Sequence, residues 1–387
     1  MVEITVIIPA YNAIDYLDES LNSIINQTFT DLEIICVDDG STDNTLERLY
    51  EYAEKDSRIQ VYTQENQGPG GATNTGLDKA TGKYIYLMDA DDILDLNALE
   101  EFHTIMEEKD VDLIIFPSID YDEDTGKYEK QDYFSMPEIN EAVGDTIFHW
   151  RDLSQNLLFK ICVTPWSKFY KHDLIKKSNA RFPTNTIYQD NPFFWEIIFN
   201  TEKIYFYNKF LYTRRTHSAS CTHSNDERNI DSIKINNIII KTFMKYGHFE
   251  EFKVKLYHTK ISLINRRYNE IRDEFKELYF SEMKKDYVKI IGHEKYDDFK
   301  SCLNLTNTYL FDNAISSSNH VEYDLKNEIS ALEMDKTRLT KEKDSSIKQV
   351  NALKKENKKL AKLNKSLLTS KSWKLTKPLR TIGRIRK

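Results

Sequence analysis

Two patterns of apolar and polar residues alternate over the first 116 positions. Short apolar runs predict strands, and they lie at 4–8, 33–37, 59–62, 84–88 and 112–116. Between these runs, apolar residues recur every three or four positions, which predicts helices. This helical spacing covers 17–25, 46–53 and 96–106. Strands separated by helices predict right-handed crossovers and a largely parallel sheet in an α/β fold.

The rest of the chain follows other patterns. Residues 117–225 are less regular and rich in aromatics, whereas residues 226–312 show helical spacing. Leucines then recur every seven residues, with Ser346 filling one gap, at Leu325, Leu332, Leu339, Leu353, Leu360 and Leu367. If these are d positions of a heptad, the a positions are Ile329, Lys336, Lys343, Val350, Asn357 and Asn364. Leucine at d with asparagine at a is typical of a weak, parallel two-stranded coiled coil, so a homodimer is expected. A single solvated helix packed on its own domain is the alternative.

Charge is distributed unevenly along the 387 residues. The chain carries −8 overall, but residues 354–387 hold 13 Lys or Arg and one acidic residue, Glu356. The other 353 residues therefore carry −20, opposite in sign to a basic nucleic-acid binder, and no nucleic-acid partner is expected. Apolar residues make up 40%, which is enough for a large core and argues against disorder of the whole chain.

Cysteine usage and the length of apolar runs bear on the cellular location. Four cysteines lie far apart, with the spacing of neither a metal site nor a disulfide framework, which favours a reducing cytosol. We see no signal-peptide pattern and no run near the roughly 18 apolar residues that a membrane-spanning helix needs. Residues 371–387 mix bulky apolar residues with Lys and Arg. That mixture predicts peripheral contact with an anionic membrane at its cytoplasmic face, and a solvated basic end is the alternative.

Polar motifs follow the predicted strands directly. Pro9-Ala10-Tyr11-Asn12 ends the first strand, where an exposed aromatic can stack on a base, although an ordinary turn with Asn12 as a helix cap is the alternative. Asp38 and Asp39 end the second strand, and one carboxylate can accept hydrogen bonds from a base imide or a ribose hydroxyl. A turn in which Ser41 or Thr42 caps the next helix explains the residues that follow.

A third acidic motif, Asp89-Ala90-Asp91-Asp92, ends the fourth strand. Asp89 and Asp91 can converge on one hard cation, Mg²⁺ or Mn²⁺, which takes oxygen ligands together with substrate phosphates. Such an ion neutralises the charge that develops on a diphosphate leaving group. Helix capping by Asp92 or Asp95 is the alternative. The carboxyl ends of strands are where open α/β sheets bind ligands, so the three motifs predict one site.

These motifs occur in order, together with Asn66-Gln67-Gly68 and Asn74-Thr75-Gly76. In this, the chain resembles glycosyltransferase family 2, whose members have the GT-A fold, over residues 1 to about 225. The resemblance implies an inverting, metal-assisted transfer from a nucleotide diphosphate sugar, usually a uridine diphosphate sugar. Similar chains with basic endings build bacterial or archaeal surface polymers, so a cell-surface glycan or lipid-linked acceptor is expected.

The resemblance also implies roles for the motif residues. Tyr11 and Asp39 would hold the base, with Pro9 and Ala10 lining its pocket. Asp89 and Asp91 would hold ribose, metal and diphosphate. The other residues assigned to the nucleotide sugar are Asn12, Asp38, Asn66, Gly68 and Asn74. Arg214 and Arg215, in a basic segment that resembles the end of family catalytic domains, suit bidentate contact with a diphosphate, and a surface basic turn is the alternative.

Asp190 matches the family's catalytic base. Gln189 stands where the family usually has Glu, which leaves the tuning of the base open. An aromatic-rich surrounding raises the pKa of a carboxyl toward the range useful for a base. An N-cap ahead of Pro192 is the alternative role for Asp190, and one residue can serve both.

We therefore expect a GT-A catalytic domain over 1–225, with a nucleotide-sugar half at 1–116 and an acceptor half at 117–225. A helical extension (226–320), a coiled coil (321–370) and a basic amphipathic tail (371–387) would follow. A sugar-1-phosphate nucleotidyltransferase would need a glycine-rich basic loop where Tyr11-Asn12-Ala13-Ile14 stands. A catalytically inactive sugar-binding scaffold would lack the acids that are present here.

Overall fold

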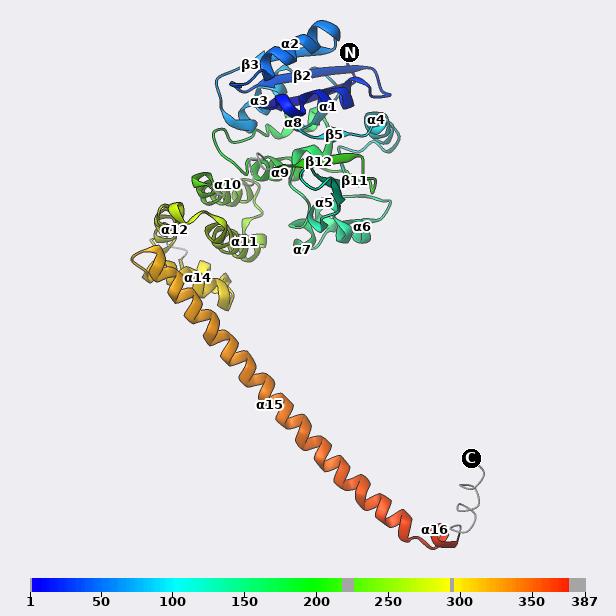
Figure 1. Ribbon diagram of the computed structural model, residues 1–387, viewed down its shortest axis with the longest axis vertical. Helices are drawn as coiled ribbons and strands as arrows, with labels where there is room; N and C mark the ends of the chain where they lie inside the picture. The colour runs from blue at the N-terminus through cyan, green and yellow to red at the C-terminus, as the bar shows by residue number, and fades with distance from the viewer. Residues whose placement is uncertain (1, 218–225, 293–295, 376–387) are drawn as a thin grey trace. The chain divides into compact units, whose positions relative to one another are not determined.

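The computed structural model describes residues 2–217, 226–292 and 296–375 (Figure 1). The chain divides into two compact units, Met1–His320 and Val321–Lys387. The first unit holds both sheets and the helices that surround them. The second consists of the long helix α15 (His320–Thr369, which begins at the unit boundary) and the short helix α16 (Lys371–Leu375).

An eight-stranded sheet forms the centre of the first unit. Its strand order is β3-β2-β1-β4-β10-β6-β11-β9. The strands are β1 (Ile4–Ala10), β2 (Leu32–Asp38), β3 (Ile59–Thr63), β4 (Tyr84–Leu87), β6 (Leu113–Ile115), β9 (Ile147–Phe148), β10 (Lys168–Lys171) and β11 (Ile204–Phe206). β1 to β4 pair in parallel, as do β6 and β11, whereas β10 runs antiparallel between the two groups. The expected largely parallel α/β sheet is confirmed.

Helices connect the parallel strands, and three of the four lie where the spacing predicted. They are α1 (Ile14–Ile25), α2 (Thr45–Lys55), α3 (Gly68–Lys79) and α4 (Ala98–Lys109). The helix α3 was not anticipated, because its first turn is the glycine-rich stretch that reads as a loop. Those glycines permit close packing: a Cβ on Gly76 would lie 2.3 Å from Cγ2 of Ile7 in β1. The helix therefore lies directly on the strand that ends in the site.

A second, four-stranded sheet has the order β5-β12-β7-β8. Its strands are β5 (Ile93–Leu94), β12 (Tyr212–Thr216), β7 (Ser118–Asp122) and β8 (Lys127–Glu129). β12 pairs in parallel with β7 and antiparallel with β5, which directly follows the acidic motif at 89–92. The pairing of β12 with β5 therefore brings the basic segment at 212–216 close to that motif. Three short helices follow β8, α5 (Asp132–Ser135), α6 (Pro137–Val143) and α7 (Gln155–Leu158).

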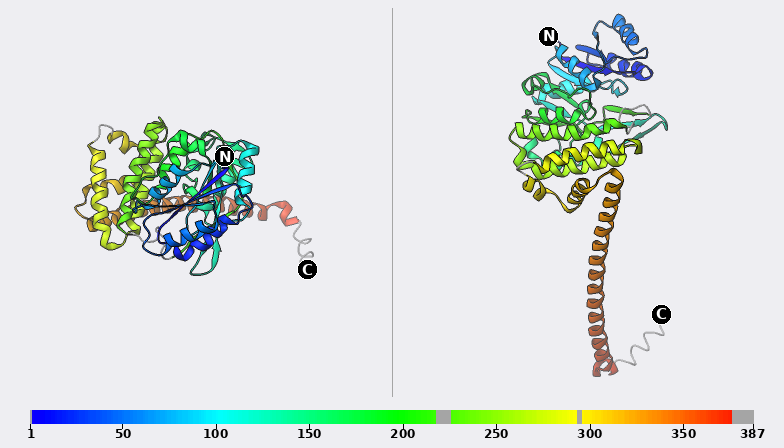
Figure 2. Two further views of the ribbon diagram at one scale, coloured as in Figure 1. Left: turned by 90° about the horizontal axis from the view of Figure 1, so that it is seen from above. Right: turned by 90° about the vertical axis from the view of Figure 1, so that its left-hand side faces the viewer.

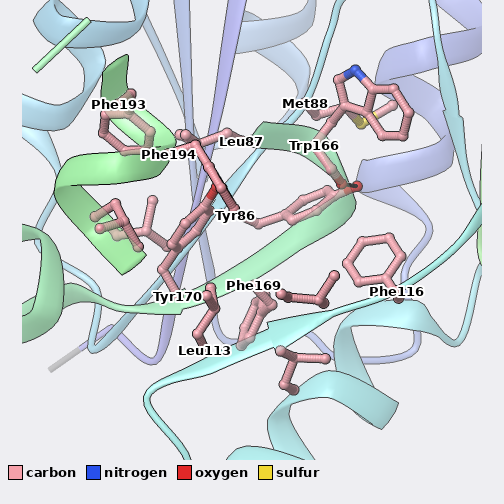
Figure 3. Close-up of a cluster of buried hydrophobic side chains, with 14 of the residues drawn as sticks. Tyr86, Leu87, Met88, Leu113, Phe116, Trp166, Phe169, Tyr170, Phe193 and Phe194 are labelled. Atoms are coloured by element: carbon pink, nitrogen blue, oxygen red, sulfur yellow. Dashed lines mark hydrogen bonds between the residues drawn. The ribbon is translucent and has the colours of Figure 1, made fainter. Parts of the chain in front are cut away.

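The aromatic residues of the middle region form the core between the sheet and α9 (Asp190–Ile198). Figure 3 shows Tyr86, Phe169 and Tyr170 on neighbouring strands, with Phe193 and Phe194 reaching them from α9. The Tyr86 hydroxyl donates to the backbone oxygen of Trp166 at 3.2 Å, so its polar end is satisfied inside the core. Large buried rings therefore fix the start of α9. A further helix, α8 (His172–Ser178), follows β10.

The described residues between 226 and 316 are mostly helical, as expected. The helices are α10 (Asp231–Lys245), α11 (Phe249–Glu270), α12 (Lys276–Ile291), α13 (Tyr296–Cys302) and α14 (Leu305–Ser316). α10 and α11 lie side by side (Figure 2), and α10 also packs on α9. The rings of Trp195 in α9 and Phe243 in α10 lie 4.7 Å apart, centroid to centroid. The helical extension therefore shares one apolar core with the sheets.

The helix α15 is 50 residues long and carries the repeated leucines. Within the described residues, no helix is both long and apolar enough to span a bilayer. Most of the expected basic tail lies outside the described residues, at 376–387. The heptad pattern on this helix predicts a coiled coil, and the coiled coil stays a prediction.

Candidate active site

The polar motifs meet at one edge of the large sheet. β2, β1 and β4 are neighbours, and Ala10 at the end of β1 pairs with Asp38 at the end of β2. The backbone of Asp39 donates to the oxygen of Ala10 at 2.8 Å. The acidic motif at 89–92 follows the neighbouring strand, β4, and thus reaches the same edge. Parallel strand ends therefore bring together motifs that are 80 residues apart in the sequence.

One carboxylate oxygen of Asp39 accepts hydrogen bonds from the described chain, and the other, the open oxygen, accepts none. Asp39 is 2% exposed, and its Oδ1 accepts from Nε2 of Gln64 at 2.7 Å and from the backbone of Gln67 at 2.9 Å. Its Oδ2 is buried and has no hydrogen-bond partner among the residues that the structure describes. Burial raises the pKa of this carboxyl. A buried acceptor without a donor is costly, so this oxygen is suited to a ligand N–H or O–H.

Asp38 and Asn12 build the loop around Asp39. Asp38 accepts from the Ser41 backbone at 3.3 Å and from the hydroxyl of Thr63 at 3.0 Å. Asn12 has a positive φ of 49°, and its Oδ1 accepts from the backbone of Thr42 at 2.8 Å. These side chains are therefore engaged within the turn. The expected capping of α2 by Ser41 or Thr42 is wrong: the N-cap position is Asn44, without a side-chain cap bond.

Tyr11 stands next to this loop with half of its surface exposed. The buried Ala10 and the half-buried Pro9 precede it in β1. Tyr11 directly follows Ala10, whose backbone oxygen is bonded to Asp39. A planar base could stack on an exposed ring and bond to an open carboxylate oxygen at this edge of the sheet.

Asn74 and the glycines of α3 tie this loop to the segment that leads to Asp190. The Asn74 side chain accepts from the backbone N–H of Phe182 at 3.0 Å and donates to its oxygen at 2.8 Å. A Cβ on Gly70 would lie 2.7 Å from the backbone oxygen of Pro183. Asn66 accepts from the N–H of Gly68 at 3.3 Å and so shapes the start of α3. Asn74 therefore acts as a structural link in the described chain.

The acidic motif brings three carboxylates together. Asp89, Asp91 and Asp92 each offer an oxygen, and these oxygens lie within 4.8 Å of one another. Asp92 is buried and accepts from the Tyr212 hydroxyl at 2.5 Å and from the Arg215 N–H at 2.6 Å, so it anchors β12. Enclosure by the protein raises the pKa of Asp89 well above its usual range, and the charges of Asp91 and Asp190 act in the same direction. A cation at this place would relieve that repulsion.

The two arginines of β12 are held in ion pairs. Arg214 donates from Nε and Nη2 to both oxygens of Asp120, at 2.9 and 2.7 Å. Arg215 pairs with Glu19 and donates from Nε to the backbone oxygen of Asp91 at 2.9 Å. Arg215 therefore positions the acidic motif at 89–92. Contact of either arginine with a diphosphate stays a prediction.

His217 is a site residue to which sequence reasoning gave no role. Its Nε2 lies 3.1 Å from Oδ2 of Asp91, and its ring lies 4.4 Å from the ring of Tyr16. The contact depends on the pairing of β12 beside β5, which brings together residues 126 positions apart. Local spacing carries no sign of that pairing.

Asp190 is the first residue of α9 and has a perturbed carboxyl group. Burial raises its pKa to about 7, and the Lys168 ammonium acts in the opposite direction. The charge of Asp190 raises the pKa of Asp89, so the two carboxyls belong to one electrostatic site. The N-cap position of α9 is Gln189, and it makes no side-chain cap bond.

Lys168 is a buried lysine whose positive charge acts on the Asp190 carboxyl. It is 1% exposed and donates to the backbone oxygens of Cys162 and Thr164, at 2.6 and 2.7 Å. Its Nζ also lies 5.2 Å from the ring centroid of Phe194 in α9. Burial lowers the pKa of Lys168 to about 8. The sequence analysis gave this lysine no role, because its contacts depend on the folded chain.

A pocket of about 110 Å³ opens beside the start of α9. Its wall is mostly aliphatic and aromatic, with amide groups at Asn191 and Asn236. The lining includes Tyr133, Leu158, Phe159, Ile161, Val163, Trp195, Ile239, Ile240, Leu256 and Leu263. The helical extension therefore helps to form a cavity at the start of α9, where Asp190 lies.

Known proteins resemble both the sequence and the fold. Over 222 residues the chain is 30% identical to the glycosyltransferase GlyA of Streptococcus pneumoniae, covering 56% of this chain and 31% of GlyA. Identity with GlyG of the same organism is 34% over 227 residues, covering 56% of this chain and 72% of GlyG. The cholesterol galactosyltransferase of Borreliella burgdorferi is 26% identical over 329 residues, covering 75% and 88%.

A solved structure with the same fold is Staphylococcus aureus TarS 1–349, in complex with UDP-GlcNAc. It superimposes with a TM-score of 0.64 at 19% identity, covering 84% of this chain and 90% of TarS 1–349. The expected GT-A fold is thereby confirmed. The model of the family named Glycosyl transferase family 2 matches residues 5–173. These residues include the loop around Asp39 and the acidic motif at 89–92. Together with the match to most of GlyG, this shows that the chain belongs to glycosyl transferase family 2.

Proposed function

We propose that the protein is an inverting glycosyltransferase that moves a sugar from a nucleotide diphosphate sugar, of the uridine class, to a hydroxyl group of a surface glycan or lipid-linked acceptor. Family membership and the names of its relatives support the transferase class. The observation that carries the proposal is the electrostatic site formed by Asp190 and Asp89. A base with a pKa of about 7 lies there beside acids suited to a metal-bound diphosphate.

The open oxygen of Asp39 supports uridine as the donor nucleoside. Uracil carries an imide N–H, and Oδ2 of Asp39 is a buried acceptor that lacks a donor within the described chain. The half-exposed ring of Tyr11 is available for stacking. The fold is that of a protein crystallised with UDP-GlcNAc, which agrees with this class of donor.

The residues at 89–92 fit a divalent cation. Asp89 and Asp91 supply the hard oxygen ligands that Mn²⁺ and Mg²⁺ prefer, whereas both oxygens of Asp92 are engaged. The ion would neutralise charge on the departing nucleoside diphosphate. Arg215 holds the backbone of Asp91, and the imidazole of His217 orients its side chain.

In the proposed reaction, Asp190 takes the proton of the acceptor hydroxyl group. The acceptor oxygen then forms a bond to the anomeric carbon from the face opposite the diphosphate. The bond from that carbon to the diphosphate oxygen breaks, and the electron pair leaves with the diphosphate. A pKa of about 7 lets Asp190 be deprotonated before the reaction at neutral pH and still accept a proton effectively.

The pocket beside α9 is the proposed place for part of the acceptor. Its apolar wall and its few amide groups suit a lipid-bearing or ring-shaped group better than a highly charged one. The relative named cholesterol galactosyltransferase matches the chain over 329 residues, well beyond the catalytic motifs. This agrees with a role for the helical extension in acceptor binding.

A thermal-shift panel tests the donor assignment. The full chain is heated with uridine, guanosine, adenosine and cytidine diphosphates and with their sugars, with and without Mn²⁺. We expect a rise in Tm with uridine nucleotides that is larger with Mn²⁺, because a ligand that binds only the folded state stabilises it. A shift with another nucleotide would refute the uridine assignment. A folded sample that responds to none of them would favour an inactive scaffold.

A further inference from the structure

The long helix α15 presents one apolar face that the described chain leaves uncovered. The six repeated leucines are 53–63% exposed, and Ile329 and Val350 are 56% and 48% exposed. Lysines also repeat every seven residues on the opposite side of the helix, at Lys341, Lys348, Lys355 and Lys362. The helix is therefore amphipathic with a period of seven, which is the period of a coiled coil.

We infer that α15 pairs with α15 of a second copy of this chain, in a parallel, in-register, two-stranded coiled coil over residues 325–367. The heptad runs for about six repeats, well beyond the three or four that indicate a coiled coil. β-Branched Ile329 and Val350 at a, with leucine at d, favour two strands over three or four. The inference is independent of the proposed transferase activity.

The polar residues at a decide the direction of the pairing. In a parallel, in-register pair, Asn357 faces Asn357 of the partner subunit, and the two amides can bond to each other. In an antiparallel pair, a positions face d positions. In the antiparallel alignment that overlaps most of residues 325–367, Asn357 would therefore face Leu332 of the partner subunit. That amide would be buried without a partner, which is costly.

The charged residues at a favour the same arrangement. Lys336 and Lys343 occupy a positions, and each directly follows an acidic residue at g. Asp335 precedes Lys336, and Glu342 precedes Lys343. In a parallel pair, a long lysine side chain at a reaches outward to the g position of the other chain. Lys343 then meets Glu342 of the partner subunit, so the lysines find opposite charges. A lipid surface is the competing occupant, but five polar residues interrupt the face that would enter it.

The mass of the full chain in solution tests the pairing. Light scattering coupled to size-exclusion chromatography should give twice the 45.6 kDa of one chain. The double variant Leu339→Asp and Leu353→Asp should lose the dimer, because it places four acids in the apolar seam. The matched variant Lys341→Asp and Lys355→Asp changes exposed residues of the same helix and should stay dimeric. A single-chain or three-chain mass of the unaltered protein overturns the inference.

Disulfide trapping tests direction and register. Under mild oxidation, Leu367→Cys at d should give a cross-linked dimer, because residue 367 faces itself only when the helices are parallel and in register. Ser366→Cys, one position away on the outer side, should cross-link far less, and the unaltered chain reports on the native cysteines. A dimer in which both variants cross-link equally, or neither does, overturns the parallel register. Dimer formation only on anionic vesicles would assign the face to a lipid surface instead.

Discussion

At the scale of single residues, the open oxygen of Asp39 makes a prediction about base selectivity. Asp39→Asn keeps an Oδ1 acceptor for Gln64 and Gln67 but replaces the open oxygen with an amide donor. Two donors would then face each other at the uracil imide. We expect uridine nucleotides to bind at least tenfold more weakly, which is about 1.4 kcal/mol. Calorimetric titration with UDP checks this, and unchanged affinity would contradict the role of Asp39.

Lys168 makes a second prediction, about the pH dependence of turnover. Its positive charge lowers the pKa of Asp190, so Lys168→Met should raise that pKa above its present value of about 7. Since the base must be deprotonated to act, the acidic limb of the rate profile should move to higher pH. Activity should fall most at or below pH 7 and recover in more alkaline buffer.

Lys168→Arg is the control, because it keeps the charge and should keep the acidic limb near its original pH. A purely structural lysine predicts another outcome. Both variants would then lose activity equally at every pH, with no movement of the limb.

Residue roles differ in how far the sequence could predict them. Asp89, Asp91 and Asp190 stand in local motifs, so they could be named in advance. Asp38, Asn12 and Asn74 stand in the same kind of motif, but their side chains form hydrogen bonds to the backbone of neighbouring loops. A motif identifies a segment and leaves open whether a side chain points to the ligand or to the backbone.

At the scale of elements, the packing of α3 on β1 predicts the effect of one added methyl group. A Cβ on Gly76 would lie 2.3 Å from Cγ2 of Ile7, a residue in a fully buried part of β1. Gly76→Ala should therefore lower stability by about 1–3 kcal/mol, because the core must shift to admit the group. A chemical denaturation curve measures this loss.

Gly292→Ala provides the comparison for that variant. Its nearest neighbours are 3.8 Å away and its φ is −73°, so alanine fits without strain. We expect a change within about 0.5 kcal/mol. An equal loss of stability in the two variants would contradict the close approach of α3 to β1.

Elements formed by local patterns were predictable, and those formed by distant pairing were not. The strands β1 to β4 and the helices α1, α2 and α4 have clear spacing and were expected. The second sheet has strands of only two to five residues, and β12 pairs with β7, more than 90 positions earlier. Glycines made the start of α3 read as a loop, although close packing against β1 and the 182–183 segment makes them suitable there.

At the scale of the whole molecule, the tail makes a prediction about membranes. Residues 371–387 carry seven Lys or Arg and no acidic residue. A chain that ends at Ser370 should bind anionic vesicles much more weakly than the full chain, because each basic residue near the surface contributes about 1 kcal/mol. Co-sedimentation with phosphatidylglycerol vesicles measures this, with neutral vesicles as the control. Equal binding of both chains would contradict a membrane role for the tail.

The central claim is that Asp190 acts on the acceptor and leaves donor binding to other residues. The most direct measurement compares Asp190→Asn with the unaltered chain in two assays, turnover of the uridine sugar identified by the thermal-shift panel and affinity for that sugar. We expect turnover to fall by about 10²–10⁴-fold, as when a general base is removed, with nearly unchanged affinity. If affinity falls as much as turnover, Asp190 holds the structure together and the proposed mechanism is wrong.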